Sequence, residues 1–196
     1  MLGMEKYLEI SRYIDWGHPA IVTLAGELSA GSKSDSVIAR RCFEWVRDSI
    51  KHSWDYRLNP VTCKASDVLR YKTGYCYAKS HLLAALLRAN RIPAGLCYQR
   101  LSVNDDGAPY CLHGLNAVFL QEHGWYRIDA RGNKSGVNAD FCPPQERLAF
   151  TVNDEQEQDF AEILAEPLDC VARVLMSSET CQDVYNNLPD ADRVPV

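Results

Sequence analysis

The feature that most constrains this chain is the segment from residue 76 to residue 89, which carries apolar side chains on nearly every helical face. Its apolar residues are Ala78, Leu82, Leu83, Ala84, Ala85, Leu86, Leu87 and Ala89. A helix that is apolar all round has to be covered on all sides, because a surface helix keeps one polar face for water. The sequence therefore predicts a central buried helix, and Asn90 followed by Pro93 predicts its C-terminal end.

The segments on either side of this helix indicate what covers it. Apolar residues spaced three and four apart predict helices before it, over about 19–28, 36–50 and 67–71. Strand-like segments follow it, over 96–103, 115–121 and 125–131. Glu122-His123-Gly124 joins the last two strands and has the length of a hairpin connection. Helices first and an antiparallel sheet afterwards predict an α+β fold.

The whole chain is expected to form one domain with three parts. These parts are an N-terminal helical lead-in over 1–34, a core over 35–150, and a C-terminal extension over 151–196 that packs on the same domain. The extension starts with an acidic stretch, residues 154–159, for which we predict a solvated helix face.

Composition and charge narrow the class of protein. The chain has no run of 18 apolar residues, so no membrane span is expected. The N-terminus lacks the basic and apolar regions of a secretory signal. The net charge of −5, without a basic stripe, argues against a nucleic-acid partner. We therefore expect a cytoplasmic protein with no nucleic-acid or membrane partner. The oligomeric state stays open.

Eight cysteines need an explanation, and their positions are 42, 63, 76, 97, 111, 142, 170 and 181. An even number permits disulfides in a secreted chain, but no C-x-x-C or zinc-finger spacing is present. Most of them lie among apolar neighbours, where a free cysteine behaves as a small apolar residue. We expect mostly buried thiols in a reducing compartment, no metal site and no cofactor.

Cys76 differs from the other cysteines because it opens the central helix, directly after Gly74-Tyr75. A helix N-terminus carries about half a positive charge and several unpaired N–H groups, and both favour the reactive thiolate over the thiol. The same N–H groups can stabilise an oxyanion when the thiolate attacks a carbonyl. Cys76 is therefore the candidate nucleophile, and the alternative is an inert core cysteine.

A thiol nucleophile needs a base and usually a third group that orients the base. His113 is the candidate base because it enters a predicted strand. The other histidines lie in polar turns, on the central helix itself or at a hairpin tip, at positions 18, 52, 81 and 123. Asp129 lies on the returning strand of the same hairpin and can accept the ring N–H of His113, although the sequence does not fix the register.

Three stretches around these candidates carry a family resemblance. They are Ala65-Ser66-Asp67-Val68-Leu69, Thr73-Gly74-Tyr75-Cys76, and residues 86–94. Together with His113 and Asp129 they resemble the core of the bacterial transglutaminase-like superfamily, over roughly residues 35–150. The resemblance implies a papain-like transglutaminase core, in which a central helix packs on an antiparallel sheet. It also implies a Cys-His-Asp triad made of Cys76, His113 and Asp129.

The chain departs from the usual family motifs around two of these residues. Family members commonly have His-Ala-Trp and Asp-Pro-Thr, whereas this chain has His113-Gly114-Leu115-Asn116 and Asp129-Ala130-Arg131. The catalytic residue types are retained, so the same chemistry is expected. The residues next to them differ from the family motifs, so a different pocket and substrate are expected. The candidate substrate-binding residues are Tyr75, Gln99, Asn116 and Arg131. Arg131 can bind a substrate carboxylate through two nitrogens, and Gln99 or Trp54 can complete an oxyanion hole. The alternative is that Arg131 is an ordinary surface arginine and Asn116 an ordinary hairpin asparagine.

The resemblance implies a thiol-dependent acyl-transfer enzyme that acts on a peptide or protein substrate and hydrolyses a peptide, isopeptide or amide bond through a thioester. The alternatives are a non-catalytic binding or scaffold domain and, second, a cross-linking protein-glutamine γ-glutamyltransferase, which needs a further pocket for an amine. Acetyl transfer from coenzyme A is disfavoured, because Thr73-Gly74-Tyr75-Cys76 stands where Arg-Gly-Gly-x-Cys is expected. Calcium activation is disfavoured because no D-x-D-x-D-G loop is present.

Overall fold

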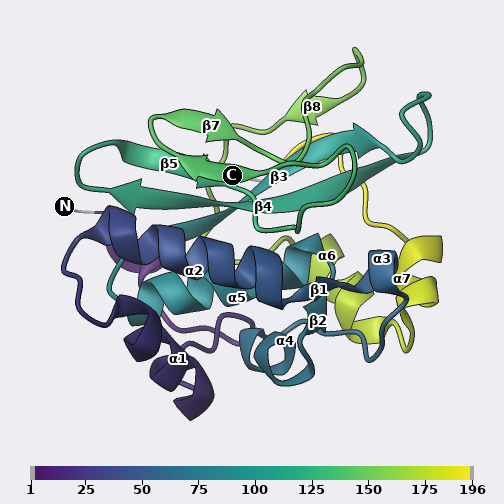
Figure 1. Cartoon of the computed structure of the whole chain (residues 1–196). Helices are drawn as coiled ribbons and strands as arrows, with labels where there is room; N and C mark the ends of the chain where they lie inside the picture. The colour runs from purple at the N-terminus through teal and green to yellow at the C-terminus, as the bar shows by residue number, and fades with distance from the viewer. Residues whose placement is uncertain (1–2, 195–196) are drawn as a thin grey trace.

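The computed structural model describes residues 3–194 and has a layer of helices packed against one face of a curled antiparallel sheet (Figure 1). Its helices are η1 (Glu5–Tyr7), α1 (Pro19–Ser29), α2 (Asp35–Ser49), α3 (Ser53–Tyr56), α4 (Ala65–Tyr71), α5 (Cys76–Ala89), α6 (Asp169–Ser177) and α7 (Cys181–Asn186). Its strands are β1 (Lys51–His52), β2 (Thr73–Gly74), β3 (Ala94–Ser102), β4 (Tyr110–Leu120), β5 (Gly124–Ile128), β6 (Asp140–Cys142), β7 (Gln145–Arg147) and β8 (Gln158–Asp159). The α+β prediction is confirmed.

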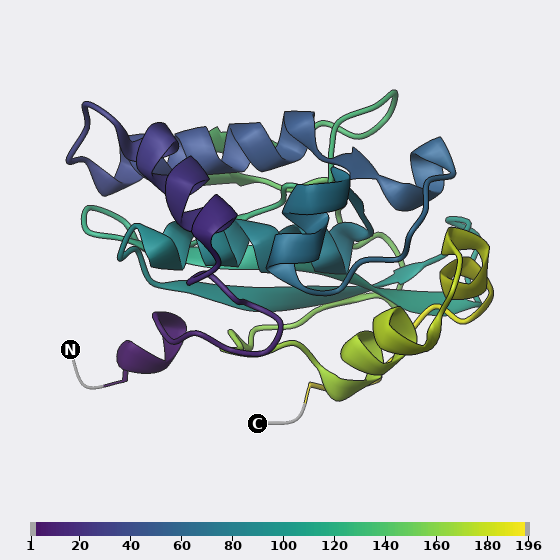
Figure 2. The same ribbon diagram turned by 90° about the horizontal axis from the view of Figure 1, so that it is seen from below.

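Helix α5 is the centre of the molecule, as its apolar pattern predicts. Every residue from Cys76 to Arg88 is buried, with α1, α2 and α4 on one side and β3 and β4 on the other (Figure 2). Three basic side chains of α5 are buried as well, and each hydrogen-bonds to backbone groups, as buried polar groups must. These contacts join Lys79 to the carbonyl groups of Arg47 and Ile50, His81 to that of Cys63, and Arg88 to those of Glu9, Ala94 and Ala165.

The main sheet has the strand order β5-β4-β3-β8 and fixes the register that the sequence left open. His113 on β4 lies opposite Gln99 on β3, and Asn116 on β4 lies opposite Ile128 on β5. Strand β5 ends at Ile128, so Asp129 lies one residue beyond the ladder. The hairpin therefore carries His113 and Asp129 to the same end of the sheet.

The C-terminal third differs from its prediction. Residues 154–159 do not form a helix: they make a turn and then strand β8, which pairs with the edge of β3. Tertiary contacts override the local pattern, because Asp159 pairs with Arg127 and the Glu157 carboxylate accepts the Ser102 N–H at 2.8 Å. Beyond this segment, helix α7 packs against α3, beside the N-terminal end of α5 (Figure 1).

All eight cysteines are free thiols, and the buried ones are Cys42, Cys63, Cys76, Cys97 and Cys181. Of the helices within residues 3–194, none combines the length and the apolar character that crossing a membrane requires. The same residues hold no group of three or more His, Cys, Asp or Glu side chains placed to bind a metal ion.

Candidate active site

Cys76 is the first residue of α5 and is 7% exposed. The chain reaches it through β2, which pairs with β1 in parallel and places Gly74 beside His52. A Cβ at Gly74 would lie 3.1 Å from Ala78 Cβ and 3.2 Å from Thr62 Oγ1, so a side chain here would require these neighbours to shift by a few tenths of an ångström. The sharp entry leaves the thiol at the positive end of α5.

Gly114, the residue after His113, explains one departure from the family motif. Its N–H donates to Cys76 Sγ at 3.5 Å, and a Cβ at this position would lie 3.0–3.1 Å from Tyr77 atoms. Glycine in place of the usual alanine therefore lets β4 approach the first turn of α5.

His113 is 5% exposed and connects the thiol to Asp129. Its Nε2 lies 2.7 Å from Asp129 Oδ2, and Cys76 is close enough to the ring for its charge to raise the pKa of His113. Phe150 packs edge-on against the ring, with centroids 4.9 Å apart. The imidazole is thus held in one orientation from two sides.

Asp129 is fully buried, and all its hydrogen bonds come from His113 or from backbone N–H groups. The N–H of Arg131 donates to Oδ1 at 3.0 Å, and the N–H of Ala149 donates to Oδ2 at 3.1 Å. Burial alone would raise the pKa of Asp129, but His113 and these two N–H groups outweigh burial and hold the pKa below its ordinary value. The carboxylate therefore stays charged.

The charge state of His113 follows from the same contacts. Burial works to lower the pKa of His113, but the charges of Asp129 and Cys76 and the hydrogen bond to Asp129 outweigh burial and raise the pKa to about 10. The ring is therefore an imidazolium at neutral pH, so a positive charge lies beside Cys76.

A cleft of about 610 Å³ opens onto Cys76 and His113. Its other walls include Trp54, Tyr185 and Phe150, and the first two rings stack with centroids 3.6 Å apart. Cys111 lines the same cleft, but burial and the nearby Cys76 raise the pKa of its thiol to about 12. One cleft therefore contains two thiols in different electrostatic settings.

The predicted substrate-binding residues divide into two groups. Tyr75 and Arg131 line the cleft, but their polar atoms already have protein partners. The Tyr75 hydroxyl donates to the Cys181 carbonyl at 2.6 Å, and the Arg131 guanidinium donates twice to Asp55, at 2.6 and 3.1 Å. Both terminal nitrogens of the Arg131 guanidinium are therefore already bound to the carboxylate of Asp55.

Gln99 and Asn116 are not among the described residues that line the cleft. The Gln99 amide donates to the Phe150 carbonyl at 3.4 Å, and the Asn116 amide donates to the carbonyl groups of Ser80 and Gly95 at 2.9 and 3.2 Å. The amide nitrogen of each side chain therefore holds elements of the fold together, whereas each amide oxygen is buried without a hydrogen-bond partner among the described residues. Trp54, in contrast, lies in the cleft wall.

Sequence reasoning missed three residues at the cleft: His52, Asp55 and Lys134. His52 and Lys134 line the cleft, and Asp55 lies between them, 3.7 Å from His52 Nδ1 and 2.8 Å from Lys134 Nζ. Burial, together with the charge of Arg131, lowers the pKa of His52 well below its ordinary value. No periodic pattern marks these residues, because His52 lies on the two-residue strand β1, Asp55 in the single turn of α3 and Lys134 beyond the end of β5.

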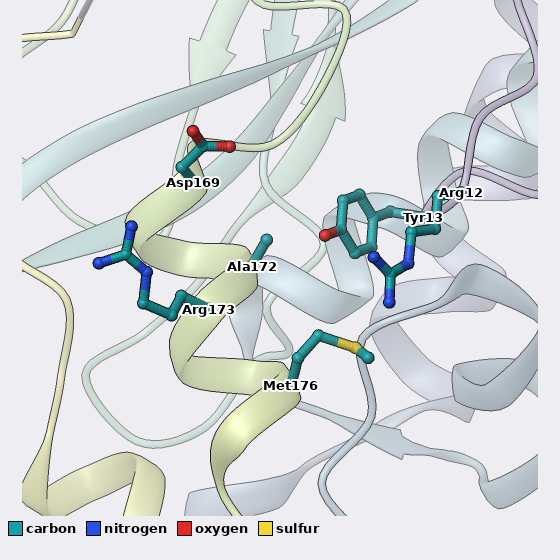
Figure 3. A pocket seen from close by; sticks show the side chains of 6 residues that line it. All are labelled: Arg12, Tyr13, Asp169, Ala172, Arg173 and Met176. Carbon is teal, nitrogen blue, oxygen red and sulfur yellow. The ribbon is translucent and has the colours of Figure 1, made fainter.

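A separate hollow of about 280 Å³ lies between the N-terminal segment and α6 (Figure 3). It is lined by Arg12, Tyr13, Asp169, Ala172, Arg173 and Met176. These lining residues include no thiol, no histidine and no hydroxyl nucleophile paired with a base, so the cleft at Cys76 is the candidate active site.

Comparisons with known proteins show the family and the fold of the chain. The family model of the transglutaminase-like superfamily matches residues 22–130, which is more than half of the chain. The chain therefore belongs to the transglutaminase-like superfamily. No curated protein sequence matches it.

Two solved structures share the fold. A candidate cysteine protease from Cytophaga hutchinsonii is similar with a TM-score of 0.53 and 20% identity, over 67% of this chain and 43% of that one. The periplasmic domain of TgpA from Pseudomonas aeruginosa, bound to ethylmercury, is similar with a TM-score of 0.50 and 19% identity, over 65% of this chain and 48% of that one. The alignments span less than half the length of either neighbour, and at these identities they show the fold alone.

Proposed function

We propose that this protein is a thiol-dependent amide hydrolase in which Cys76 is the nucleophile, His113 the acid and base, and Asp129 the group that orients His113. The observation that carries the proposal is the His113–Asp129 pair, buried and 2.7 Å apart, beside a thiol at a helix N-terminus. Burying two charged groups is costly unless they are paired, and a purely structural domain gains little from placing them at an open cleft.

The proposed reaction has two halves. The Cys76 thiolate adds to the carbonyl carbon of a peptide, isopeptide or amide bond, and the unpaired N–H at the start of α5 stabilises the oxyanion. The His113 imidazolium gives its proton to the leaving amine as the C–N bond breaks, which leaves a thioester. Water then attacks the thioester, His113 takes its proton, and the acid product leaves with Cys76 again a thiolate.

The first test is alkylation with iodoacetamide across pH 5–9, read by peptide mass spectrometry at all eight cysteines. The peptide with Cys76 should be labelled fastest at pH 6–7, while Cys111 serves as a control thiol in the same cleft. Equal rates at Cys76 and Cys111 would contradict the proposal and favour a non-catalytic binding domain.

Hydrolysis and cross-linking are separated with a peptide substrate library incubated with and without a primary amine such as dansylcadaverine. Release of the acid product alone supports hydrolysis. Transfer of the amine to the acyl group, at the expense of the acid, would instead support γ-glutamyl transfer.

A further inference from the structure

A cluster of charges borders the cleft on the side of α3. Asp55 accepts hydrogen bonds from both terminal nitrogens of Arg131, at 2.6 and 3.1 Å, and from Lys134 Nζ at 2.8 Å. Both cations line the cleft that contains Cys76 and His113. Burial alone would raise the pKa of Asp55, but the two cations outweigh it and hold the pKa at about 2. One carboxylate is therefore shared by two permanent cations, and one positive charge is left over.

Among the residues that the structure describes, the Arg131 and Lys134 side chains have no ion-pair partner other than Asp55. His52 Nδ1 lies 3.7 Å from Asp55 and has no hydrogen-bond partner, and the lowered pKa of His52 keeps its ring neutral. A neighbouring hollow of about 410 Å³ shares His52 and Lys134 with the cleft and adds Lys51, for which the described residues provide no ion-pair partner. The chain as a whole carries a net charge of −5, and Asp105 and Glu157 also line the cleft, so the positive surplus belongs to the cluster of Arg131, Lys134 and Asp55 and not to the cleft as a whole.

Lys134 is the cation of this cluster that can bind a second carboxylate. Its side chain is 47% exposed, whereas that of Arg131 is 8% exposed and both its terminal nitrogens are committed to Asp55. A lysine ammonium has three N–H donors, and Asp55 takes one of them. A second carboxylate arriving in the cleft would therefore meet a free donor and an uncompensated charge.

We propose that Lys134, backed by Arg131 and Asp55, forms a carboxylate-binding subsite, so that the preferred substrate carries a carboxylate close to the bond cleaved at Cys76. This inference rests on the proposed function, because Cys76 defines where the subsite lies relative to the reacting bond. The carboxylate can belong to an acidic side chain or to a free C-terminus. The chemistry that Lys134 recognises is the same in both cases.

Three alkylating probes test the subsite without knowledge of the natural substrate. They are N-iodoacetyl-glutamine amide, which is neutral, N-iodoacetyl-glutamic acid α-amide, with a side-chain carboxylate, and N-iodoacetyl-glutamine, with a terminal carboxylate. In each case the Cys76 thiolate forms an S–C bond and iodide leaves with the C–I bonding electrons. The measured quantity is the ratio of the labelling rate of each charged probe to that of the neutral probe.

At low ionic strength we expect at least one charged probe to label Cys76 several times faster than the neutral probe. The faster of the two identifies whether a side-chain or a terminal carboxylate is preferred. The ratio should fall several-fold in Lys134→Gln, because the substitution removes the positive charge. It should also fall several-fold in 0.5 M salt, because salt screens the attraction between the charges. Lys33→Gln, which removes a lysine between α1 and α2, makes the same change in net charge and should leave the ratio as in the wild type.

The outcomes separate the two proposals. If the neutral probe labels Cys76 faster than Cys111 but the ratio is the same in the wild type and Lys134→Gln, the subsite is refuted and the proposed function stands. If the neutral probe does not label Cys76 faster than Cys111, the proposed function is refuted, and the subsite falls with it.

Discussion

Two histidine–aspartate pairs border the same cleft, and their charge states are opposite. His113 and Asp129 lie 2.7 Å apart, and the pKa of His113 is raised to about 10 against the effect of burial by Asp129 and Cys76. His52 and Asp55 lie 3.7 Å apart, and burial, with the charge of Arg131, lowers the pKa of His52 well below its ordinary value. The first ring is a cation at neutral pH, and the second is neutral.

The difference comes from what else each carboxylate binds. Asp129 accepts only backbone N–H groups besides His113, so its full negative charge acts on the imidazole. Asp55 binds Arg131 and Lys134, and at the His52 ring the positive charge of Arg131 opposes the negative charge of Asp55. A histidine near an aspartate is therefore not sufficient to make a base, because the other partners of the aspartate decide the charge on the ring.

The largest expected effect is that of removing the charged ring. His113→Gln should slow iodoacetamide labelling of Cys76 at pH 7 by about 100-fold or more, in line with the usual contribution of a positioned acid or base. His123→Gln, at the exposed tip between β4 and β5, is the matched control and should keep the wild-type rate. Similar rates for the two variants would remove His113 from the mechanism.

A smaller effect is expected from neutralising the carboxylate behind that ring. Asp129→Asn removes the charge that supports the imidazolium, so the pKa of His113 should fall from about 10 toward its ordinary value. The labelling rate of Cys76 should fall about 10- to 100-fold, because orientation survives in part and charge does not. The pKa is measured from the imidazole NMR shift, and an unchanged pKa would contradict the role given to Asp129.

The same Asp129→Asn variant should also lose stability. The asparagine side chain offers one acceptor oxygen to the three N–H groups that the Asp129 carboxylate serves. The free energy of unfolding should therefore fall by about 1–3 kcal/mol, as for a buried group that loses its partner. Urea unfolding measures this loss, and it separates a stability defect from the loss of thiol reactivity.

The free energy of unfolding should change with pH in opposite directions for the two histidines. Each slope is at most about 1.4 kcal/mol per pH unit, because one proton is taken up or released. The folded pKa of His113 is raised, so its stabilisation is complete below about pH 6.5 and is lost as pH rises toward 10. The folded pKa of His52 is lowered, so burying it becomes destabilising as pH falls below about 6.5. Unfolding free energies of the wild type, His113→Gln and His52→Gln across pH 5–9 should show the two slopes, and slopes of equal sign would break the comparison.

The smallest effect is expected from making the second pair resemble the first. In a double variant, Arg131→Gln with Lys134→Gln, the charge of Asp55 becomes available to His52. The pKa of His52 should rise by about one unit, or about 1.4 kcal/mol. NMR titration measures this, with the pKa of His113 as the internal reference. No rise would show that burial alone, and not the cations on Asp55, sets the charge of His52.

Much of the fold is predictable from local pattern. The segment 76–89 could only be a central helix, and the predicted hairpin brings His113 and Asp129 to one end of the sheet, as the register of β4 and β5 shows. The predicted helix at residues 154–159 is wrong. The charge pattern does not report that the end of this segment pairs with the edge of β3 and that Asp159 forms an ion pair with Arg127.

The site is predictable in its residue types but not in its partners. The sequence by itself determined a thiol at the start of a buried helix, a histidine and an aspartate on one hairpin, and the superfamily to which they belong. Only the tertiary structure decided that Arg131 binds Asp55, 76 positions away, and that Gln99 and Asn116 hold the fold together. The physical reason is that periodicity reports which face of an element is buried, whereas the charge of a buried group depends on neighbours that the folded chain brings from distant positions.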